Sequence, residues 1–121
     1  MFAGIAPTLP FIKAGKLRAV AVSSAQRASA LPDVPPVADA MPGFEASSFY
    51  GLFAPSATPK DVIVKLNQEI AKAFRSADMR ERLAREGTEV VAGSPEEFDI
   101  FFRAETAKWA QVIKQAGIQL D

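Results

Sequence analysis

The 121-residue chain has the length of one ordinary domain, and its 49% hydrophobic and 23% charged residues are typical of a globular protein rather than a disordered one. Lys plus Arg number 14, as do Asp plus Glu, so no net charge favours nucleic acid or an anionic membrane as a partner. The sequence has no Cys and no His, which removes thiolate chemistry, the commonest general base and the commonest metal ligand. We therefore expect no enzyme, no metal site and no cofactor.

The first residues are predicted to form an α/β unit. Residues 2–4 have the character of a strand end, and Thr8 is a suitable N-cap for a short helix over residues 9–14, which Gly15 would end. Residues 17–24, LRAVAVSS, are typical of a buried parallel strand. A strand, a short helix and a second buried strand favour an α/β fold over an antiparallel meander. The N-terminal residues lack the basic region of a secretory signal.

A proline-rich stretch follows, with prolines at positions 32, 35, 36 and 42 and room for only one short helix near residues 37–41. A loop of this length within a compact domain is often functional or a crossing between lobes. We interpret residues 25–45 as such a crossing, stiffened by its prolines.

The clearest strand-to-helix succession is SSFYGLFAPSATPKDVIVKLN, residues 47–67. Residues 47–54 are apolar and uncharged, as in a strand covered on both faces, and Pro55 would end its hydrogen-bond ladder. Thr58-Pro59-Lys60-Asp61 supplies a capping hydroxyl, a proline at the first helical position and a carboxylate at the positive end of the helix dipole. A helix is predicted from residue 59 to about 75.

Three elements are predicted in the last third of the chain. A short helix over residues 77–86 lies between Ser76 and Gly87, and residues 89–92 suggest an edge strand. The final helix opens with a capping box, Ser94-Pro95-Glu96-Glu97, and runs to Ala116 before a glycine stop. Its predicted core face consists of Phe98, Phe101, Phe102, Trp109, Val112, Ile113 and Ala116.

Glu105 falls in the middle of that apolar face. Because an unpaired carboxylate there would be costly, we predict that it is largely buried and bonded, either to backbone N–H groups or to an Arg.

No catalytic motif is present, and the Arg-rich stretch at residues 75–85 is interleaved with acidic residues, as on a solvated helix face. Three sets of candidate ligand contacts remain. Phe2, Ala3, Gly4 and Ile5 lie at a predicted strand end beside a helix start, where free N–H groups bind carboxylates. Ser23 ends an apolar strand, where open α/β sheets place ligands.

The third candidate is Phe49, which with Tyr50 lies on the central predicted strand, so that one of the two side chains would face a cleft. For every candidate an ordinary structural role stays open: a strand–helix connection, a turn, or core packing. None of the candidates is a titratable side chain, so we predict that titratable groups do not set ligand specificity.

Several stretches, taken in order, carry a family resemblance. They are IKAGKLRAVAV at residues 12–22, Arg27 with LPDVP at residues 31–35, YGLFAP at residues 50–55 followed by Thr58-Pro59, the pair Glu105 and Trp109, and AGI at residues 116–118. Together they resemble the substrate-binding proteins of tripartite tricarboxylate transporters, also called Bug proteins. The resemblance covers essentially the whole chain but only the C-terminal part of the longer family members, without their signal peptide or N-terminal ligand loops.

The resemblance implies part of a two-lobed fold of the type 2 periplasmic-binding-protein kind, α/β with a mixed or parallel sheet flanked by helices. Residues 1–24 would end one lobe and contain a hinge strand, residues 25–45 would cross between lobes, and residues 46–121 would form the back half of the other lobe. The implied function is periplasmic capture of a small carboxylate for membrane permease subunits. The alternative is a stand-alone α/β interaction or assembly module without ligand binding.

We also predict association of the isolated chain. If residues 1–24 lack part of their lobe, the apolar faces of residues 17–22 lose their cover, and an exposed uncharged strand edge pairs readily with another chain. We therefore expect a homo-oligomer formed through the N-terminal segment, by domain swapping or strand addition, with weak or no carboxylate binding by the chain alone. The competing outcome is that the C-terminal helices fold back over residues 17–22 and give a compact monomer.

Overall fold

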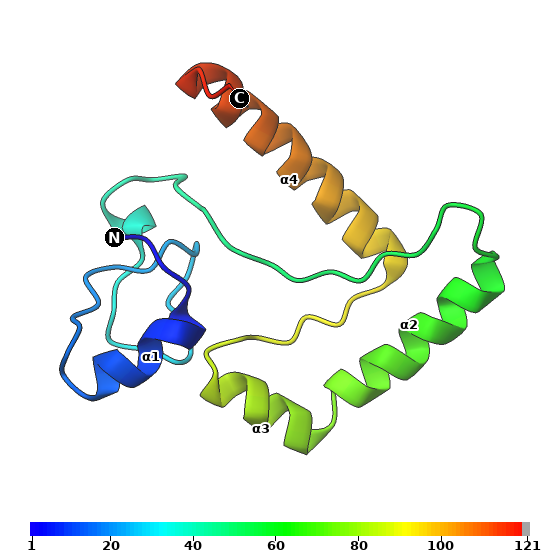
Figure 1. The fold of residues 1–121 in the computed structure, drawn as a ribbon, viewed down its shortest axis with the longest axis horizontal. Coiled ribbons are helices and arrows are strands. Elements are labelled where there is room, and N and C mark those ends of the chain that lie inside the picture. Colours follow the sequence, from blue (N-terminus) through cyan, green and yellow to red (C-terminus); the bar gives the residue numbers. More distant parts are fainter. Residues whose placement is uncertain (120–121) are drawn as a thin grey trace. The chain divides into compact units, whose positions relative to one another are not determined.

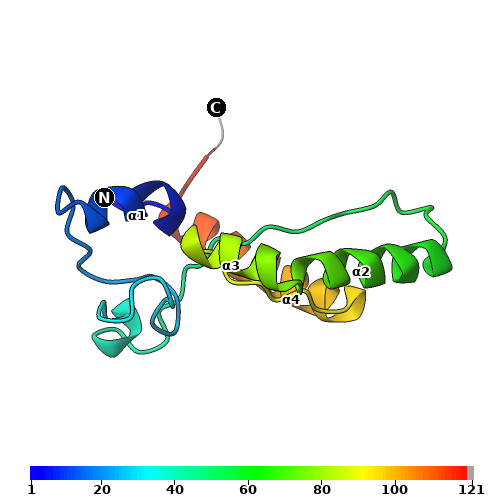
Figure 2. The ribbon, with the colours of Figure 1, turned by 90° about the horizontal axis from the view of Figure 1, so that it is seen from below.

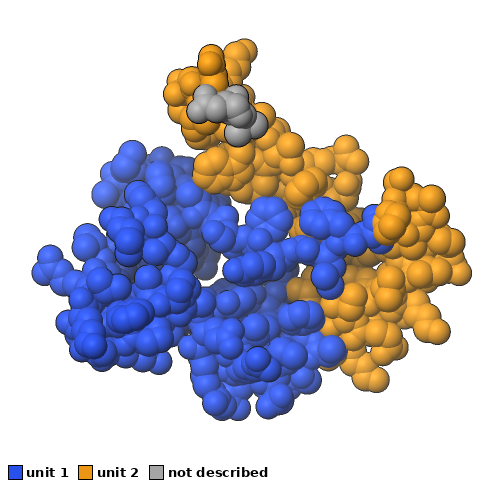
Figure 3. Space-filling view, in the orientation of Figure 1, with its two compact units in different colours: residues 1–54, 73–91 blue, residues 55–72, 92–121 orange. Residues whose placement is uncertain are grey.

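The computed structural model describes residues 1–119. The regular elements of this part are α1 (Ile5–Lys13), the 3₁₀ helix η1 (Val37–Asp39), α2 (Lys60–Phe74), α3 (Ala77–Arg85) and α4 (Pro95–Ala116) (Figure 1). Residues 1–54 with 73–91 form one compact unit, here called unit 1, and residues 55–72 with 92–121 form unit 2 (Figure 3). Among the described residues, every helix is too short or too polar to cross a membrane.

Three helices end in the same way, at a glycine with a left-handed backbone. The φ angles are +70° at Gly15, +73° at Gly87 and +64° at Gly117. After α3, for example, the Gly87 N–H donates to the Ala84 carbonyl (3.0 Å) and the Thr88 N–H donates to the Leu83 carbonyl (2.9 Å). The same pair of bonds, the Schellman motif, closes α1 and α4. The predicted glycine stops are confirmed.

The start of α4 is also as predicted. Ser94 Oγ accepts a hydrogen bond from the Glu97 N–H (3.1 Å), and the Ser94 N–H donates to the Glu97 carboxylate (2.7 Å). Both groups would otherwise be unpaired donors at a helix N-terminus, so this reciprocal pair sets where the helix begins.

The start of α1 differs from the prediction. The helix begins at Ile5 rather than residue 9, and Thr8 is an interior residue whose hydroxyl donates to the Gly4 carbonyl (2.8 Å) and also approaches that of Ile5 (3.1 Å). N–H groups in the first helical turn have no intrahelical partner, so Pro7 removes no bond there and the helix can start earlier. The predicted N-cap role of Thr8 is wrong.

The strands predicted over residues 2–4, 17–24, 47–54 and 89–92 are not formed in the described chain, which contains one isolated parallel bridge between Val22 and Pro36. At this bridge the Val22 N–H donates to the Pro35 carbonyl and the Val37 N–H donates to the Val22 carbonyl, both at 2.9 Å. Figures 1 and 2 show most of residues 14–54 as irregular chain apart from η1. A strand requires a ladder of bonds to a neighbour, and apolar composition alone does not supply one. At the last predicted strand, Ala92 has φ of +46°, outside the strand region.

The buried apolar residues are few. In unit 1 they include Leu9 and Val22, and in unit 2 Ala71. Several apolar side chains of the predicted core face of the final helix are partly exposed, among them Phe101 at 42% and Trp109 at 40%. Within unit 2, the Asn67 side-chain amide of α2 donates to the Gly93 carbonyl (2.9 Å), which ties α2 to the segment that leads into α4.

Candidate ligand-binding segments

The first candidate segment, residues 2–5, leads into the N-terminus of α1. Gly4 occupies the N-cap position with an extended backbone and no side-chain cap, and the first turn contains no acidic residue. The N–H groups of Ile5 and Ala6 precede the first full turn, so they have no intrahelical acceptor and lie at the positive end of the helix dipole. This arrangement can accept a carboxylate without a charged side chain.

Ile5 is packed against the end of α3. A Cβ atom built on Gly87 would lie 2.5 Å from Ile5 Cγ2 and 3.5 Å from the Ala30 Cβ, so the two segments meet where only a glycine fits. Nearby, the Glu89 carboxylate accepts a weak hydrogen bond from the Ser29 N–H (3.4 Å). The sequence identifies Gly87 as a helix stop, but the contact with Ile5 joins residues far apart along the chain and has no local signal.

Ser23 and Phe49 also lie in unit 1. Ser23 is half-buried after the Val22 bridge, and its backbone carbonyl accepts a hydrogen bond from the Ala46 N–H (2.9 Å). Phe49 is 40% exposed, whereas Tyr50 is 93% exposed, so Phe49 is the better covered of this pair. The structure thus assigns the segment at 2–5, Ser23 and Phe49 to one compact unit.

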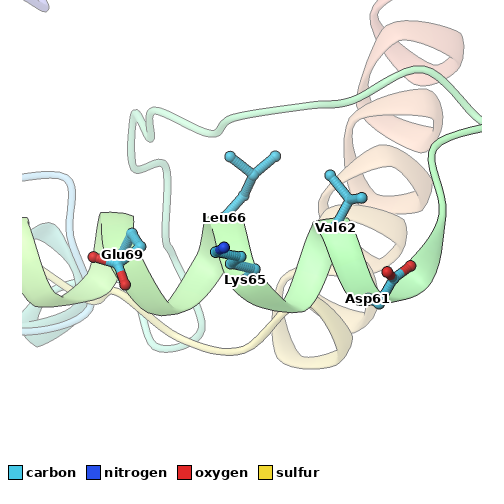
Figure 4. Close-up of a pocket in the computed structure, with 5 residues that line it drawn as sticks. All are labelled: Asp61, Val62, Lys65, Leu66 and Glu69. Atoms are coloured by element: carbon cyan, nitrogen blue, oxygen red, sulfur yellow. The ribbon is translucent and has the colours of Figure 1, made fainter.

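A surface hollow of about 410 Å³ lies elsewhere, on α2. It is lined by Asp61, Val62, Lys65, Leu66 and Glu69, none of which is a predicted contact (Figure 4). All five side chains come from one helix, and Val62 and Leu66 remain 41% and 48% exposed. Ligand sites draw convergent groups from several elements, so this hollow is an open helix face rather than a built site.

The prediction for Glu105 is confirmed in part. Its side chain is 15% exposed and paired with Lys108, and its Oε2 accepts a hydrogen bond from Trp109 Nε1 (2.9 Å). The bond from Lys108 lowers the pKa of Glu105, desolvation opposes this, and the Trp109 bond adds to the lowering. The expected backbone or Arg partner is wrong, because residues three and four positions along the same helix already reach the carboxylate.

The Arg-rich stretch behaves as a solvated helix face. Arg85 pairs with Glu81 (2.6 Å) and Arg82 lies 3.8 Å from Glu86, all with exposed side chains. In α4, an equally exposed pair between Arg103 and Asp99 (2.8 Å) lowers the pKa of Asp99. In residues 1–119, acidic side chains do not gather into a group able to hold a metal ion.

Comparison with known proteins gives the family. The model of the tripartite tricarboxylate transporter family receptors matches residues 1–118. A UPF0065 protein from the tcbD-tcbE intergenic region of Pseudomonas sp. (strain P51) is 40% identical over 84% of this chain and 31% of its own length. Protein BugT of Bordetella pertussis is 34% identical over 93% of this chain and 35% of its own.

Among solved structures, the periplasmic binding protein BugD superposes with a TM-score of 0.79 and 32% sequence identity, over 93% of this chain and 38% of BugD. The chain therefore spans about a third of the length of these relatives. Since the family match extends over nearly every residue, the chain belongs to the tripartite tricarboxylate transporter family of receptors.

Proposed function

We propose that the chain forms the C-terminal part of a periplasmic solute-binding receptor, which captures a small carboxylate and presents it to the membrane permease subunits of a tripartite tricarboxylate-type transporter. The observation that carries the proposal is the superposition on BugD over 93% of the chain, together with the family match over residues 1–118. A receptor family also favours binding over catalysis, in agreement with the composition. In this proposal residues 1–24 end one lobe, residues 25–45 cross to the other, and residues 46–121 complete it.

The proposed contacts are Phe2, Ala3, Gly4 and Ile5, with Ser23 and Phe49 as further contributors. The free N–H groups at the start of α1 support this choice, because they suit a carboxylate that is held by donors rather than by a counter-charge. Residues 17–24 and 47–54 would pair with strands in the complete two-lobed fold and so restore the expected sheet.

The test is a chimaera in which the matching part of BugD is replaced by this chain. Isothermal titration calorimetry with succinate and citrate should show saturable binding, whereas the neutral analogue succinamide should show none. The 121-residue chain alone should bind weakly or not at all. A chimaera that is folded by circular dichroism and binds succinamide as well as succinate would contradict the proposal.

The contact residues are tested by a matched pair of variants in the chimaera. Ala3→Asp places a negative charge beside the N–H donors and should weaken succinate binding by about tenfold or more, which is 1.4 kcal/mol or more. Ala3→Asn has a similar size without the charge and should bind nearly as the parent does. Equal affinities for the two variants would remove residues 2–5 from the site. The alternative function, an interaction module, predicts no carboxylate binding by any folded version.

Association of the isolated chain through its N-terminal segment is part of the same proposal. Its support is partial exposure of the apolar run at residues 17–22, in which Leu17 is 41% and Val20 is 74% exposed while Val22 is buried.

A further inference from the structure

The glycine that ends α3 lies where three segments of unit 1 meet. A Cβ atom built on Gly87 would stand 2.5 Å from Ile5 Cγ2 and 3.5 Å from the Ala30 Cβ, so this glycine neighbours both the start of α1 and the loop that follows Val22. Ile5, Ala30 and Gly87 are all half-buried. Figures 1 and 2 both place the start of α1 beside the end of α3. We call these three residues the Gly87 cluster.

The loop that reaches the Gly87 cluster is closed at its base. The Ala46 N–H donates to the Ser23 carbonyl (2.9 Å), beside the isolated parallel bridge, so residues 23–46 leave and return at one place. Ser23 lies at this base, and Phe49 follows shortly after Ala46 in the sequence. Contacts that fix the loop therefore also fix the base from which Ser23 and Phe49 extend.

Two side-chain hydrogen bonds stiffen this loop and attach it to the residues after α3. Arg27 Nη1 donates to the Pro32 carbonyl (3.2 Å) and closes a turn within the loop. The Ser29 N–H donates weakly to the carboxylate of Glu89 (3.4 Å), which follows Gly87 closely in the sequence. The end of α3 therefore holds the loop by a packing contact and a hydrogen bond, and it holds the start of α1 by a packing contact.

We propose that Gly87 is a positioning residue of the receptor. Through Ile5 and Ala30 it sets how the proposed ligand contacts lie relative to one another, and so it sets the affinity for the carboxylate. The inference rests on the proposed function and adds to it a residue that is not itself a contact. A separation of 2.5 Å is about 1 Å shorter than an ordinary contact between carbon atoms, so a side chain at residue 87 would displace one of these segments. Hydrogen bonds to a ligand are lost by displacements of that size.

Isothermal titration calorimetry with succinate on the BugD chimaera tests the positioning role. Gly87→Ala should raise the Kd about tenfold or more, the effect of losing one hydrogen bond to a charged group. Gly15→Ala is the matched control, because Gly15 has the same left-handed backbone with nothing within 4 Å of the new Cβ. Its Kd should stay within about twofold of the parent's. A Gly87→Ala variant with a lower binding stoichiometry but an unchanged Kd has only lost folded molecules, and that result would overturn the proposal.

Relief of the clash provides a second test. Adding Ile5→Ala to Gly87→Ala removes Cγ2, so the double variant should bind succinate more tightly than Gly87→Ala does. If circular dichroism shows Gly87→Ala to be unfolded, Ile5→Ala by itself carries the test, because it removes the contact without a clash. It should raise the Kd about threefold, whereas Ile12→Ala, at the other half-buried isoleucine of α1, should leave the Kd unchanged. A double variant no better than Gly87→Ala, or equal Kd values for the two isoleucine variants, would refute the positioning role.

A measurement without ligand separates this inference from the proposed function. In NMR spectra of the 121-residue chain, the Ile5 γ2 methyl group should show a nuclear Overhauser effect to the Gly87 Hα, because the two residues are in contact. A parent chimaera that binds no succinate contradicts the proposed function. Absence of the nuclear Overhauser effect contradicts the positioning role of Gly87, even where the parent chimaera binds succinate.

Discussion

Replacing Gly87 by alanine tests the contact that holds the start of α1 against the end of α3. The new Cβ would stand 2.5 Å from Ile5 Cγ2 and 3.2 Å from Ile5 Cβ. Because Cγ2 branches directly from Cβ, it cannot swing clear as the tip of a long side chain would, so the backbone of one segment must shift. The contact lies within unit 1, so its loss should reduce the stability of that unit.

Gly15 provides a matched control. It ends α1 with φ of +70°, as Gly87 ends α3 with φ of +73°, but nothing lies within 4 Å of a Cβ built on it. At either site, an alanine in the left-handed backbone conformation costs about 1–2 kcal/mol of stability. The lower conformational entropy of the unfolded chain with alanine offsets about 0.4–1 kcal/mol of that cost. Forcing an extra methyl into packed surroundings adds about 1–3 kcal/mol, and only at Gly87. We therefore expect Gly87→Ala to be the more destabilising by about 1–3 kcal/mol.

Urea unfolding followed by circular dichroism measures both variants, with the difference read from the transition midpoints at unchanged m-value. A double-mutant cycle with Ile5→Ala isolates the clash: the double variant should be more stable than the sum of the single changes by about 1–3 kcal/mol, because Cγ2 is gone. If Gly87→Ala and Gly15→Ala cost the same, and the cycle shows no coupling, Ile5 does not pack on Gly87 and the reasoning fails.

Three other predictions follow from individual contacts. Leu9→Ala should lower the free energy of unfolding by about 2–5 kcal/mol, measurable in urea, since Leu9 is only 4% exposed; exposed Met41→Ala is the control. Ser94→Ala should cost about 0.5–2 kcal/mol and reduce helicity by circular dichroism, and Ser94→Asp should restore both, because Asp is also a good N-cap. Finally, the lowered pKa of Glu105 means that its ionised form is favoured by folding. Its contribution to stability is therefore complete above the ordinary carboxyl pKa of about 4.3 and is lost as the pH falls through the lowered folded value. Fluorescence of Trp109, the single tryptophan, should report this acid transition. The transition should disappear in Glu105→Gln and persist in Glu96→Gln. An unchanged transition in Glu105→Gln would contradict the assignment.

The elements that the sequence determined by itself are those whose cause is local. The capping box at Ser94 and the stop at Gly117 are complete within a few residues, and α4 begins and ends where these signals predict. The same holds for the stops at Gly15 and Gly87, because a left-handed residue after a helix is set by its own backbone preference and its nearest carbonyls. The ordered motifs along the chain also identified the receptor family, which the match over residues 1–118 confirms.

Elements that depend on distant partners were decided only by the tertiary structure. The Val/Ala run at 17–24 contributes a single bridge rather than a strand, because backbone groups become a ladder only where a neighbour accepts them. The partners of Glu105 follow from which side chains reach it on α4, where Lys108 and Trp109 replace the expected backbone or Arg. The candidate segment at residues 2–5 has no local signal for what holds it. Its position depends on the packing of Ile5 against Gly87, a residue of the same unit that lies far along the chain. A van der Waals contact of this kind is set by proximity in space and produces no periodic pattern in the sequence.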